Sequence, residues 1–330
     1  MMSPWRFWAG SAALLAGLLA LVVWLLLHWN MSNFSQQIAD RLLLLAELRR
    51  GAVQEYFSTA EAELRFWSSN ADILDAQAEL VSLWQAGDVT QQVQQSYIED
   101  NPNPPGFYLN LDDAGDGSAW SEVHAAVHPV YRDVVDRLGL FDLFLIEPES
   151  GVVVYSVNKR PGFASSLDLG PFSGSELAEV FDRIRADPAA GAVTSDIASY
   201  DPALLTPVGS VGTPIMDGDR LVGVLVLMYD SAKLTAITTA DGDWDGGGFP
   251  PTGESFVIGA DGTTRTDPRT FLESPEDHLD ASAVAGDLTP RQRVTIEEAG
   301  TTVLTQEVDD VTFDAGVEGD TRIEKRSTMT

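Results

Sequence analysis

The sequence predicts an α+β protein that begins with a transmembrane helix and a long stalk helix, followed by two lobes built on antiparallel sheets, the second incomplete. Three observations lead to this prediction. Residues 7–27 contain no charged side chain. Apolar residues recur at helical spacing from Ser32 to Trp84, where no proline occurs. Beyond residue 140, short runs rich in Val, Ile, Phe and Tyr alternate with turns, which is typical of hairpins.

Charge and composition narrow the possible partners. The chain has 330 residues and a formal net charge of −30, from 50 acidic and 20 basic side chains. This charge argues against a nucleic-acid partner, whose phosphates need cationic side chains, and against docking on an anionic lipid surface. A hydrophobic share of 44% is that of a globular protein. The chain has no cysteine, which excludes disulfides and thiolate metal sites.

The uncharged stretch of residues 7–27 is long enough to span a bilayer, which takes about 20 residues. Tryptophans gather toward its two ends, where such rings favour the membrane interface: Trp5, Trp8, Trp24 and Trp29. A cleaved signal peptide is the alternative, but it has a shorter apolar core and a small-residue cleavage site. We therefore expect a cytoplasmic segment at 1–6, a transmembrane helix at 7–29 and the lipid bilayer as a partner.

The helical pattern that follows predicts a stalk over residues 30–95. A single helix over most of Ser32–Trp84 would be about 75 Å long, which suits a stalk leaving a membrane better than a soluble core. On this interpretation the helix also pairs with its copy in a homodimer. The alternative is two shorter core helices that break near Ser68, Ser69 and Asn70.

The first lobe is expected over residues 96–240. Two nearly continuous apolar runs, Phe141–Ile146 and Val152–Val157, flank a turn and predict a hairpin that is covered on both faces. More strands and helices complete the expected lobe. The strands are Val193–Ile197, Val208–Ile215 and Leu221–Tyr229, and the helices are Trp120–Val127, Pro129–Leu138, Ser173–Ala186 and Ser231–Thr239.

The second lobe is expected over residues 241–330, after a break at Gly246–Pro251. The runs Ser255–Ala260 and Thr263–Thr266 flank an Asp-Gly turn and predict another hairpin. Two further strands are expected, at Gln292–Glu298 and Thr301–Val308.

Several residues of and around the first hairpin form a pattern: Phe141–Ile146, Gly151–Val157, Lys159, Phe163, Leu167 and Gly170–Phe172. The pattern resembles the extracytoplasmic double Cache sensors of bacterial receptors, particularly those of adenylate/guanylate cyclases and methyl-accepting chemotaxis proteins. Gly253–Gly262 and Arg265 continue the resemblance, which covers roughly residues 97–269. It implies two PAS-like lobes, a small-molecule ligand in the membrane-distal lobe, and a cytoplasmic cyclase or chemotaxis output that this C-terminally truncated chain lacks.

The resemblance also implies a place in the bacterial inner membrane, with residues 30–330 extracytoplasmic. The alternative function is that of a non-signalling adhesion or scaffold module held at the membrane. The sequence has no Gly-x-Ser-x-Gly motif, no phosphate-cradling loop and no Ser/His/Asp set. We therefore expect neither enzyme activity in this chain nor a cofactor.

Two motifs are candidates for metal binding. His124 and His128 have the i, i+4 spacing of a zinc pair on a helix, but Pro129 is expected to push His128 out of helical geometry. Asp241, Asp243 and Asp245 match the start of a calcium-binding loop, yet its twelfth position is a threonine instead of the carboxylate that calcium needs. We therefore expect no metal, with the three aspartates as the weaker alternative.

Five residues are expected to contact a ligand between the sheet of the first lobe and the segments that cover it: Tyr155, Lys159, Tyr200, Asp201 and Met228. Tyr155 would present its hydroxyl, and Lys159 would meet an anionic group. Tyr200 and Asp201 lie on a loop expected to cover the hairpin. Met228 takes the place where, by the resemblance, amino-acid-binding relatives have an aspartate, which argues against an amino acid ligand.

Overall fold

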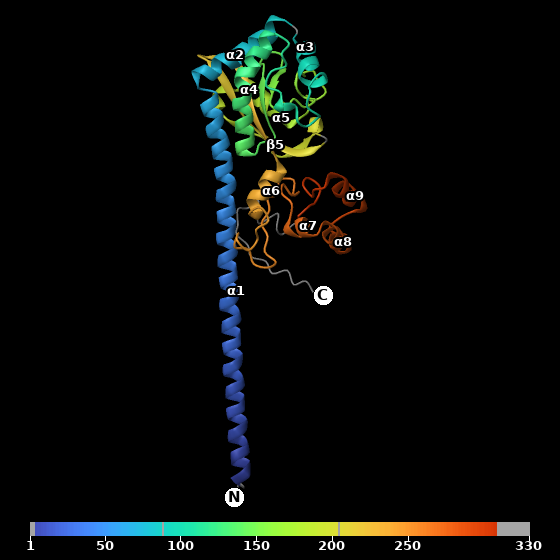
Figure 1. Cartoon of the computed structure of the whole chain (residues 1–330). Helices are drawn as coiled ribbons and strands as arrows, with labels where there is room; N and C mark the ends of the chain where they lie inside the picture. Colours follow the sequence, from blue (N-terminus) through green and yellow to red (C-terminus); the bar gives the residue numbers. More distant parts are fainter. Residues whose placement is uncertain (1–3, 88, 204, 309–330) are drawn as a thin grey trace.

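The computed structural model describes residues 4–87, 89–203 and 205–308. A helix of 64 residues, α1 (Pro4–Trp67), runs along the molecule, with a sheet lobe at its C-terminal end and a second lobe beside its middle (Figure 1). The other helices are α2 (Ala71–Ala86), α3 (Thr90–Gln94), α4 (Ala119–Leu138), α5 (Glu176–Ala186), α6 (Ser231–Thr239), α7 (Arg269–Glu273), α8 (Pro275–Ala285) and α9 (Pro290–Ala299). Shorter turns are η1 (Gln95–Glu99), η2 (Tyr108–Asn110), η3 (Pro188–Ala190) and η4 (Asp201–Ala203).

The first lobe is organised around one antiparallel sheet, which confirms the expected α+β class. Its strands are β1 (Asp142–Ile146), β2 (Val153–Ser156), β3 (Val193–Thr194), β4 (Ala198–Tyr200), β5 (Thr206–Asp217) and β6 (Arg220–Asp230). Their order is β2-β1-β6-β5-β3, and β4 also pairs with β5. The predicted hairpin is β1–β2, and β4 is a short strand that the sequence did not indicate.

Helices cover both faces of this sheet, which explains why its strands are apolar on both sides. On one face, Tyr155 contacts Tyr131 of α4, and Tyr229 contacts Phe57 of α1. On the other face, a side chain added at Gly212 would meet Val180 and Ile184 of α5 at 2.7 and 2.8 Å. We call these the α4 face and the α5 face.

The prediction of a single stalk helix over Ser32–Trp84 is wrong beyond Trp67, where α1 ends. The break falls at the Ser-Ser-Asn sequence of the alternative, where the Ser69 hydroxyl donates to the Arg65 carbonyl and the chain reverses. After the turn, α2 packs on α4, and the Gln77 amide donates to the Tyr131 hydroxyl. The apolar repeat beyond Trp67 therefore belongs to the core of the sheet lobe.

The two helices expected on either side of His128 are one continuous helix, α4, with Pro129 inside it. Its N-terminus is capped by Ser118, and its C-terminus ends at Gly139 in a left-handed conformation. Seven residues of α4 are buried. This packing outweighs the single backbone hydrogen bond that a proline removes.

The second lobe departs furthest from prediction. The described residues beyond 240 hold isolated bridges, Ile258 to Thr264 and Thr263 to Glu307, in place of the expected hairpin and strands. The segment expected as a strand at Gln292–Glu298 lies in α9. Its start is a capping box in which Thr289 and Gln292 exchange hydrogen bonds, with Pro290 at the first helical position. These capping signals explain why the segment forms a helix instead of a strand.

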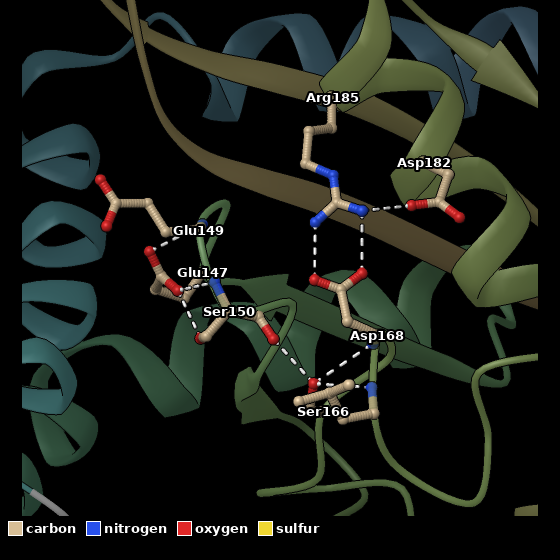
Figure 2. Close-up of polar contacts among 8 residues, drawn as sticks. Glu147, Glu149, Ser150, Ser166, Asp168, Asp182 and Arg185 are labelled. Atoms are coloured by element: carbon tan, nitrogen blue, oxygen red, sulfur yellow. Dashed lines mark hydrogen bonds and ion pairs between the residues drawn. The ribbon is translucent and has the colours of Figure 1, made fainter.

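Polar contacts fix the loops around β1 and β2 (Figure 2). Glu147 accepts hydrogen bonds from Glu149 N and from both the amide and the hydroxyl of Ser150, which closes the β1–β2 turn. Arg185 of α5 makes a two-pronged contact with Asp168, at 2.7 and 2.8 Å. The loop that follows Lys159 is thereby tied to α5.

Candidate functional site

Lys159 lies in a tight turn just after β2, and Asp142 at the start of β1 holds this turn. The Asp142 carboxylate is buried and accepts hydrogen bonds from Val157 N, Asn158 N and the Ser156 hydroxyl. The Ser156 hydroxyl oxygen in turn accepts from Lys159 N at 2.8 Å. Lys159 has a φ of 50°, a left-handed conformation that costs free energy for a residue with a Cβ. The surrounding hydrogen bonds hold it there.

Lys159 is only 1% exposed, so its side-chain amine is buried. The amine has few hydrogen-bond partners. Nζ lies 3.3 Å from the Val157 carbonyl oxygen, 3.5 Å from His128 Nε2 and 5.5 Å from the centroid of the Tyr97 ring. No carboxylate of the described residues forms an ion pair with it. A buried ammonium without such a partner is costly.

The hydrogen bonds of His128 decide which of its ring nitrogens carries the proton. Nε2 lies 2.7 Å from the Leu109 carbonyl oxygen, which can only accept, so Nε2 donates. Nδ1 then accepts from the Tyr155 hydroxyl at 2.6 Å. Because Nε2 carries the proton, its 3.5 Å contact with Lys159 Nζ offers no lone pair to the ammonium form of the lysine.

Two polar atoms beside this cluster are buried without a hydrogen-bond partner: Trp120 Nε1 and His124 Nε2. His124 Nδ1 lies 2.8 Å from the Asp112 carbonyl oxygen and must donate to it, which leaves Nε2 as an unprotonated acceptor. Trp120, His124 and His128 recur every four residues on α4, and their rings stack with centroids 4.8 and 4.4 Å apart. Unpaired buried polar groups of this kind are rare in folded proteins and call for an explanation.

Burial disfavours the charged forms of the titratable groups in the cluster. Desolvation lowers the pKa of Lys159 to about 7, although the charge of Asp142 acts in the opposite direction. Desolvation also lowers the pKa of His128 to about 3 and that of His124 well below its usual value, with Lys159 adding to both effects. It raises the pKa of Asp142 to about 6, against the hydrogen bonds that favour the carboxylate.

The expected ligand residues separate onto the two faces of the sheet. Tyr155 is opposite Leu145, which is opposite Leu225, so Tyr155 and Lys159 belong to the cluster on the α4 face. Met228 is opposite Asp142 and Ser210, three residues from Leu225, and thus lies on the α5 face.

Tyr200 is buried at the end of β4, and a side chain added at Gly162 would come within 2.9 Å of its hydroxyl. It thus touches the loop that follows Lys159. Asp201 lies in η4 and is exposed. The structure thus brings Tyr155 and Lys159 together on the α4 face and places Met228 on the α5 face, while the ligand role of the five residues stays a prediction.

The candidate metal ligands do not form a site in the structure. Among residues 4–308, as far as they are described, no three His, Cys, Asp or Glu side chains are grouped as metal ligands. Asp243 instead accepts a hydrogen bond from Gly246 N in the turn that holds Asp241 and Asp245. Pro129 does not pull His128 out of the helix, so the expected geometry was wrong, although both imidazoles have other roles.

Sequence reasoning missed Tyr97, Trp120, Asp112 and Arg132 as members of this site. Arg132 of α4 donates to the Leu109 carbonyl and to the Asp112 carboxylate, which fastens the loop before α4 to the helix. The spacing of Trp120, His124 and His128 was the available signal. In the sequence, the spacing of His124 and His128 indicated a structural or pocket-edge role, with zinc as the alternative.

Hollows elsewhere in the described molecule have a different character. One of about 440 Å³ lies in the second lobe beside His278, and one of about 470 Å³ lies between the lobes beside Asp230 and Asp267. None of the residues that line them carries an unpaired buried polar atom. The cluster around Lys159 is closed, and it holds two of the buried side-chain atoms without a hydrogen-bond partner, Trp120 Nε1 and His124 Nε2.

Comparison with known proteins finds likeness only among solved structures. No family model matches the chain, and no curated protein matches it. One similar structure is the ligand-binding domain of the Pseudomonas aeruginosa amino acid chemoreceptor PctC in complex with GABA. It has 19% identity and a TM-score of 0.30, over 56% of this chain and 73% of that one.

Two further structures belong to the same kind of domain. The sensory domain of the Campylobacter jejuni chemoreceptor Tlp3 has 13% identity and a TM-score of 0.33, over 66% of this chain and 76% of that one. The sensor domain of the Vibrio cholerae histidine kinase DctB has 14% identity and a TM-score of 0.26, over 50% and 59%.

All three similar structures are described as sensor, sensory or ligand-binding domains, and the kinship with cyclases stays a prediction.

Proposed function

We propose that the chain is the ligand-sensing part of a membrane receptor and that its sensory site is the cluster around Lys159. The observation that carries the proposal is a buried amine with a single long hydrogen bond, beside two buried polar atoms that have none. Unpaired polar groups in a folded core cost free energy, whereas a bound ligand forms hydrogen bonds with them. Binding there would bear directly on α4 and on the turn after β2.

The membrane part of the proposal rests on α1. Within the described residues it is the helix long and apolar enough to cross a membrane. We place residues 7–29 in the bacterial inner membrane and residues 30–330 outside the cytoplasm. The exposed side of α1 also carries Leu44 and Leu48, which are 61% and 58% exposed, and we assign this side to a homodimer.

The output is a cyclase or chemotaxis domain beyond this chain. A shift of α4 would reach it through the sheet and α1, which packs on β5, β6 and α6.

A screen for ligand-induced thermal stabilisation tests the sensory site. The full chain in detergent micelles is mixed with neutral, anionic and cationic metabolites, and its melting temperature is recorded. We expect stabilisation by at least one small molecule, because binding to the native state alone raises stability. The stabilisation should disappear in Lys159→Met.

Lys233→Met is the matched control, because Lys233 lies at the base of the same lobe and faces the Tyr56 ring at 5.8 Å. It should keep the stabilisation. If no small molecule stabilises the wild type, or if Lys159→Met responds as strongly, Lys159 is not at a sensory site. The first result would favour the adhesion or scaffold function instead.

A further inference from the structure

The cluster around Lys159 is closed to solvent. Lys159 and the aromatic residues of the cluster are at most 2% exposed: Tyr97, Trp120, His124, His128 and Tyr155. A small molecule would reach the Lys159 amine only after the cluster had opened, whereas a proton needs no cavity. What opens the cluster therefore decides whether the proposed sensory site is accessible.

The position of the Lys159 amine suits its neutral form. His128 Nε2 carries a proton and lies 3.5 Å from Lys159 Nζ, so it can share this proton with the lone pair of a neutral amine. An ammonium has no lone pair, and it would face the His128 N–H group with a proton of its own. The Val157 carbonyl oxygen, 3.3 Å from Nζ, can accept from either form and does not distinguish them.

An ammonium at this position would lack an ion-pair partner among the described residues. Charged and titratable groups face the amine from the elements packed against it: His124, His128 and Arg132 of α4, Asp112 of the preceding loop, Tyr97 of η1, Tyr155 of β2 and Asp142 of β1. Asp112 is paired with Arg132, and the Asp142 carboxylate accepts hydrogen bonds from the turn after β2. Burial therefore lowers the pKa of Lys159 to about 7, even though both aspartates act in the opposite direction.

Lys159 connects two elements of the first lobe. Its amine contacts His128 in the middle of α4, and its backbone belongs to the turn after β2, where Lys159 N donates to the Ser156 hydroxyl. This turn holds Lys159 at a φ of 50°, which costs free energy. The turn also lies at the surface, since Pro161 is exposed and Arg160 is half-buried. A short movement of the turn would therefore carry the amine to solvent and separate it from α4.

We propose that Lys159 is a proton-operated latch: its neutral amine holds the cluster closed, and its ammonium leaves the cluster and opens it as the pH falls. One proton passes from solvent to Nζ, and no covalent bond changes besides the new N–H bond. The open form exposes Trp120 Nε1 and His124 Nε2, two of the buried atoms without partners, to a ligand. The latch adds a regulation to the sensory site proposed above and rests on that proposal for its role in signalling.

The pH range of the latch follows from the two forms of the site. In the closed form the pKa of Lys159 is about 7, and in the open form it returns to its usual value of 10.5. The open form thus binds the proton more tightly, and the ratio of open to closed molecules rises about tenfold for each pH unit lost from 10.5 to 7. Below about pH 7 both forms are protonated, and the ratio stays constant.

Hydrogen exchange of the full chain in detergent micelles at pH 7 and pH 9 tests the latch. In this window His124 and His128 are neutral and Asp142 is ionised, so a change belongs to Lys159. Protection factors, which correct for the intrinsic exchange rate at each pH, are compared for residues 120–131, 152–163 and 206–230. We expect the first two segments to be about a hundredfold less protected at pH 7 than at pH 9, while β5 and β6 stay the more protected at both.

Substitutions of Lys159 separate its charge from its packing. Lys159→Met takes up no proton, so both segments should be equally protected at the two pH values. Lys159→Arg stays charged, so both segments should be poorly protected at pH 9 as well as at pH 7. Lys233→Met is the matched control and should behave like wild type.

Other results overturn the inference in distinct ways. If Lys159→Met keeps the pH dependence of wild type, another group carries it. If β5 and β6 become as poorly protected as the two segments at pH 7, the proton acts on the folding of the whole lobe and there is no latch. If a small molecule stabilises the chain through Lys159 while protection does not change with pH, the latch is wrong and the proposed function remains. If protection changes as expected but no small molecule stabilises the chain, the latch stands and the proposed ligand site does not.

Discussion

At the scale of single residues, the main feature is a buried lysine, Lys159, whose surroundings disfavour its charged form. Lys159 is held in a strained left-handed turn by Ser156 and Asp142, and its amine meets a carbonyl, a tyrosine face and an N–H group. The strain and the burial both cost stability without improving packing. Such a combination is typical of sites kept for binding.

The first prediction concerns pH and this amine. Because the pKa of Lys159 is lowered to about 7 from an unfolded value of 10.5, the unfolded chain binds the proton more tightly between these values. Lys159 therefore destabilises the fold at and below pH 7, and this penalty is lost as the pH rises toward 10.5. In the window above pH 7 its contribution to stability rises by about 1.4 kcal/mol per pH unit.

Melting of wild type and Lys159→Met between pH 6 and 10 measures this effect. The variant should be the more stable protein at pH 7, and the gap should close as the pH rises. Lys233→Met should run parallel to wild type. Parallel curves for Lys159→Met as well would mean that the amine has a partner or remains charged.

At the scale of elements, packing outweighed a local signal in α4, whereas a local turn signal outweighed the apolar repeat at the end of α1. Pro129 pointed to two helices, yet α4 is continuous because its buried face contacts the sheet and the loop before it. The apolar repeat up to Trp84 pointed to one helix, yet Ser68, Ser69 and Asn70 end it. The strands β1, β2, β5 and β6 were predicted well. A strand that is buried on both faces forms a continuous apolar run, which can be identified without knowing its neighbouring strands.

The second prediction belongs to α1. Leu45 belongs to the apolar repeat of α1, but it is buried, and a side chain added at Gly248 of the second lobe would meet it at 3.4 Å. Leu44 and Leu48 lie on the free side, so Leu44→Glu with Leu48→Glu should weaken self-association. Ala46→Glu is the control, because Ala46 is exposed elsewhere on the helix. Analytical ultracentrifugation in detergent micelles measures the change.

A dimer that persists in the double variant would assign the interface to another surface. A monomer at every concentration, in wild type as in both variants, would leave α1 as a spacer. Charges at Leu45 itself would be uninformative, because they would disrupt the contact with the second lobe.

At the scale of the whole molecule, the second lobe shows how little a sequence pattern says when few apolar residues are buried. Its apolar core among the described residues is small: Phe271, Leu279, Leu288 and Ile296. The alternation at Ser255–Thr266 predicted strands, but extended segments need a partner strand, and the described part of the lobe supplies only bridges. Part of the candidate site was also missed. Its members come from α4, η1 and the turn after β2, which are far apart in the sequence and meet only in the fold.

Polar contacts, more than a shared core, hold this lobe to the rest. Arg41 and Arg49 of α1 donate to the carbonyls of Gly248 and Gly247, and Arg49 also lies over the Phe249 ring. On the far side, Arg265 makes a two-pronged contact with Asp196, which follows β3 of the first lobe, at 2.9 and 2.7 Å. Arg265 thus joins the two lobes directly, as do the hydrogen bonds from Ser255 to the Thr238 carbonyl and from Asp267 N to the Thr235 hydroxyl.

The last prediction is that this contact couples the lobes. Arg265 is 4% exposed and also bonds Thr263 and Asp261, so Asp196→Ala would leave its guanidinium buried with fewer partners. The Asp196 side chain is 59% exposed, so water compensates in part, and we expect a loss of about 1–2 kcal/mol. Hydrogen exchange should show the loss at residues 255–266, while β1 and β6 stay protected.

Comparison of Asp196→Ala, Arg265→Met and the double variant separates the pair from its neighbours. If the two residues act mainly on each other, the double variant should lose less than the sum of the single losses. Asp280→Ala is the control, because it removes an ion pair with Arg293 inside the second lobe and leaves the lobe boundary intact. Additive losses, or faster exchange throughout the first lobe, would show that Arg265 supports local packing instead of joining the lobes.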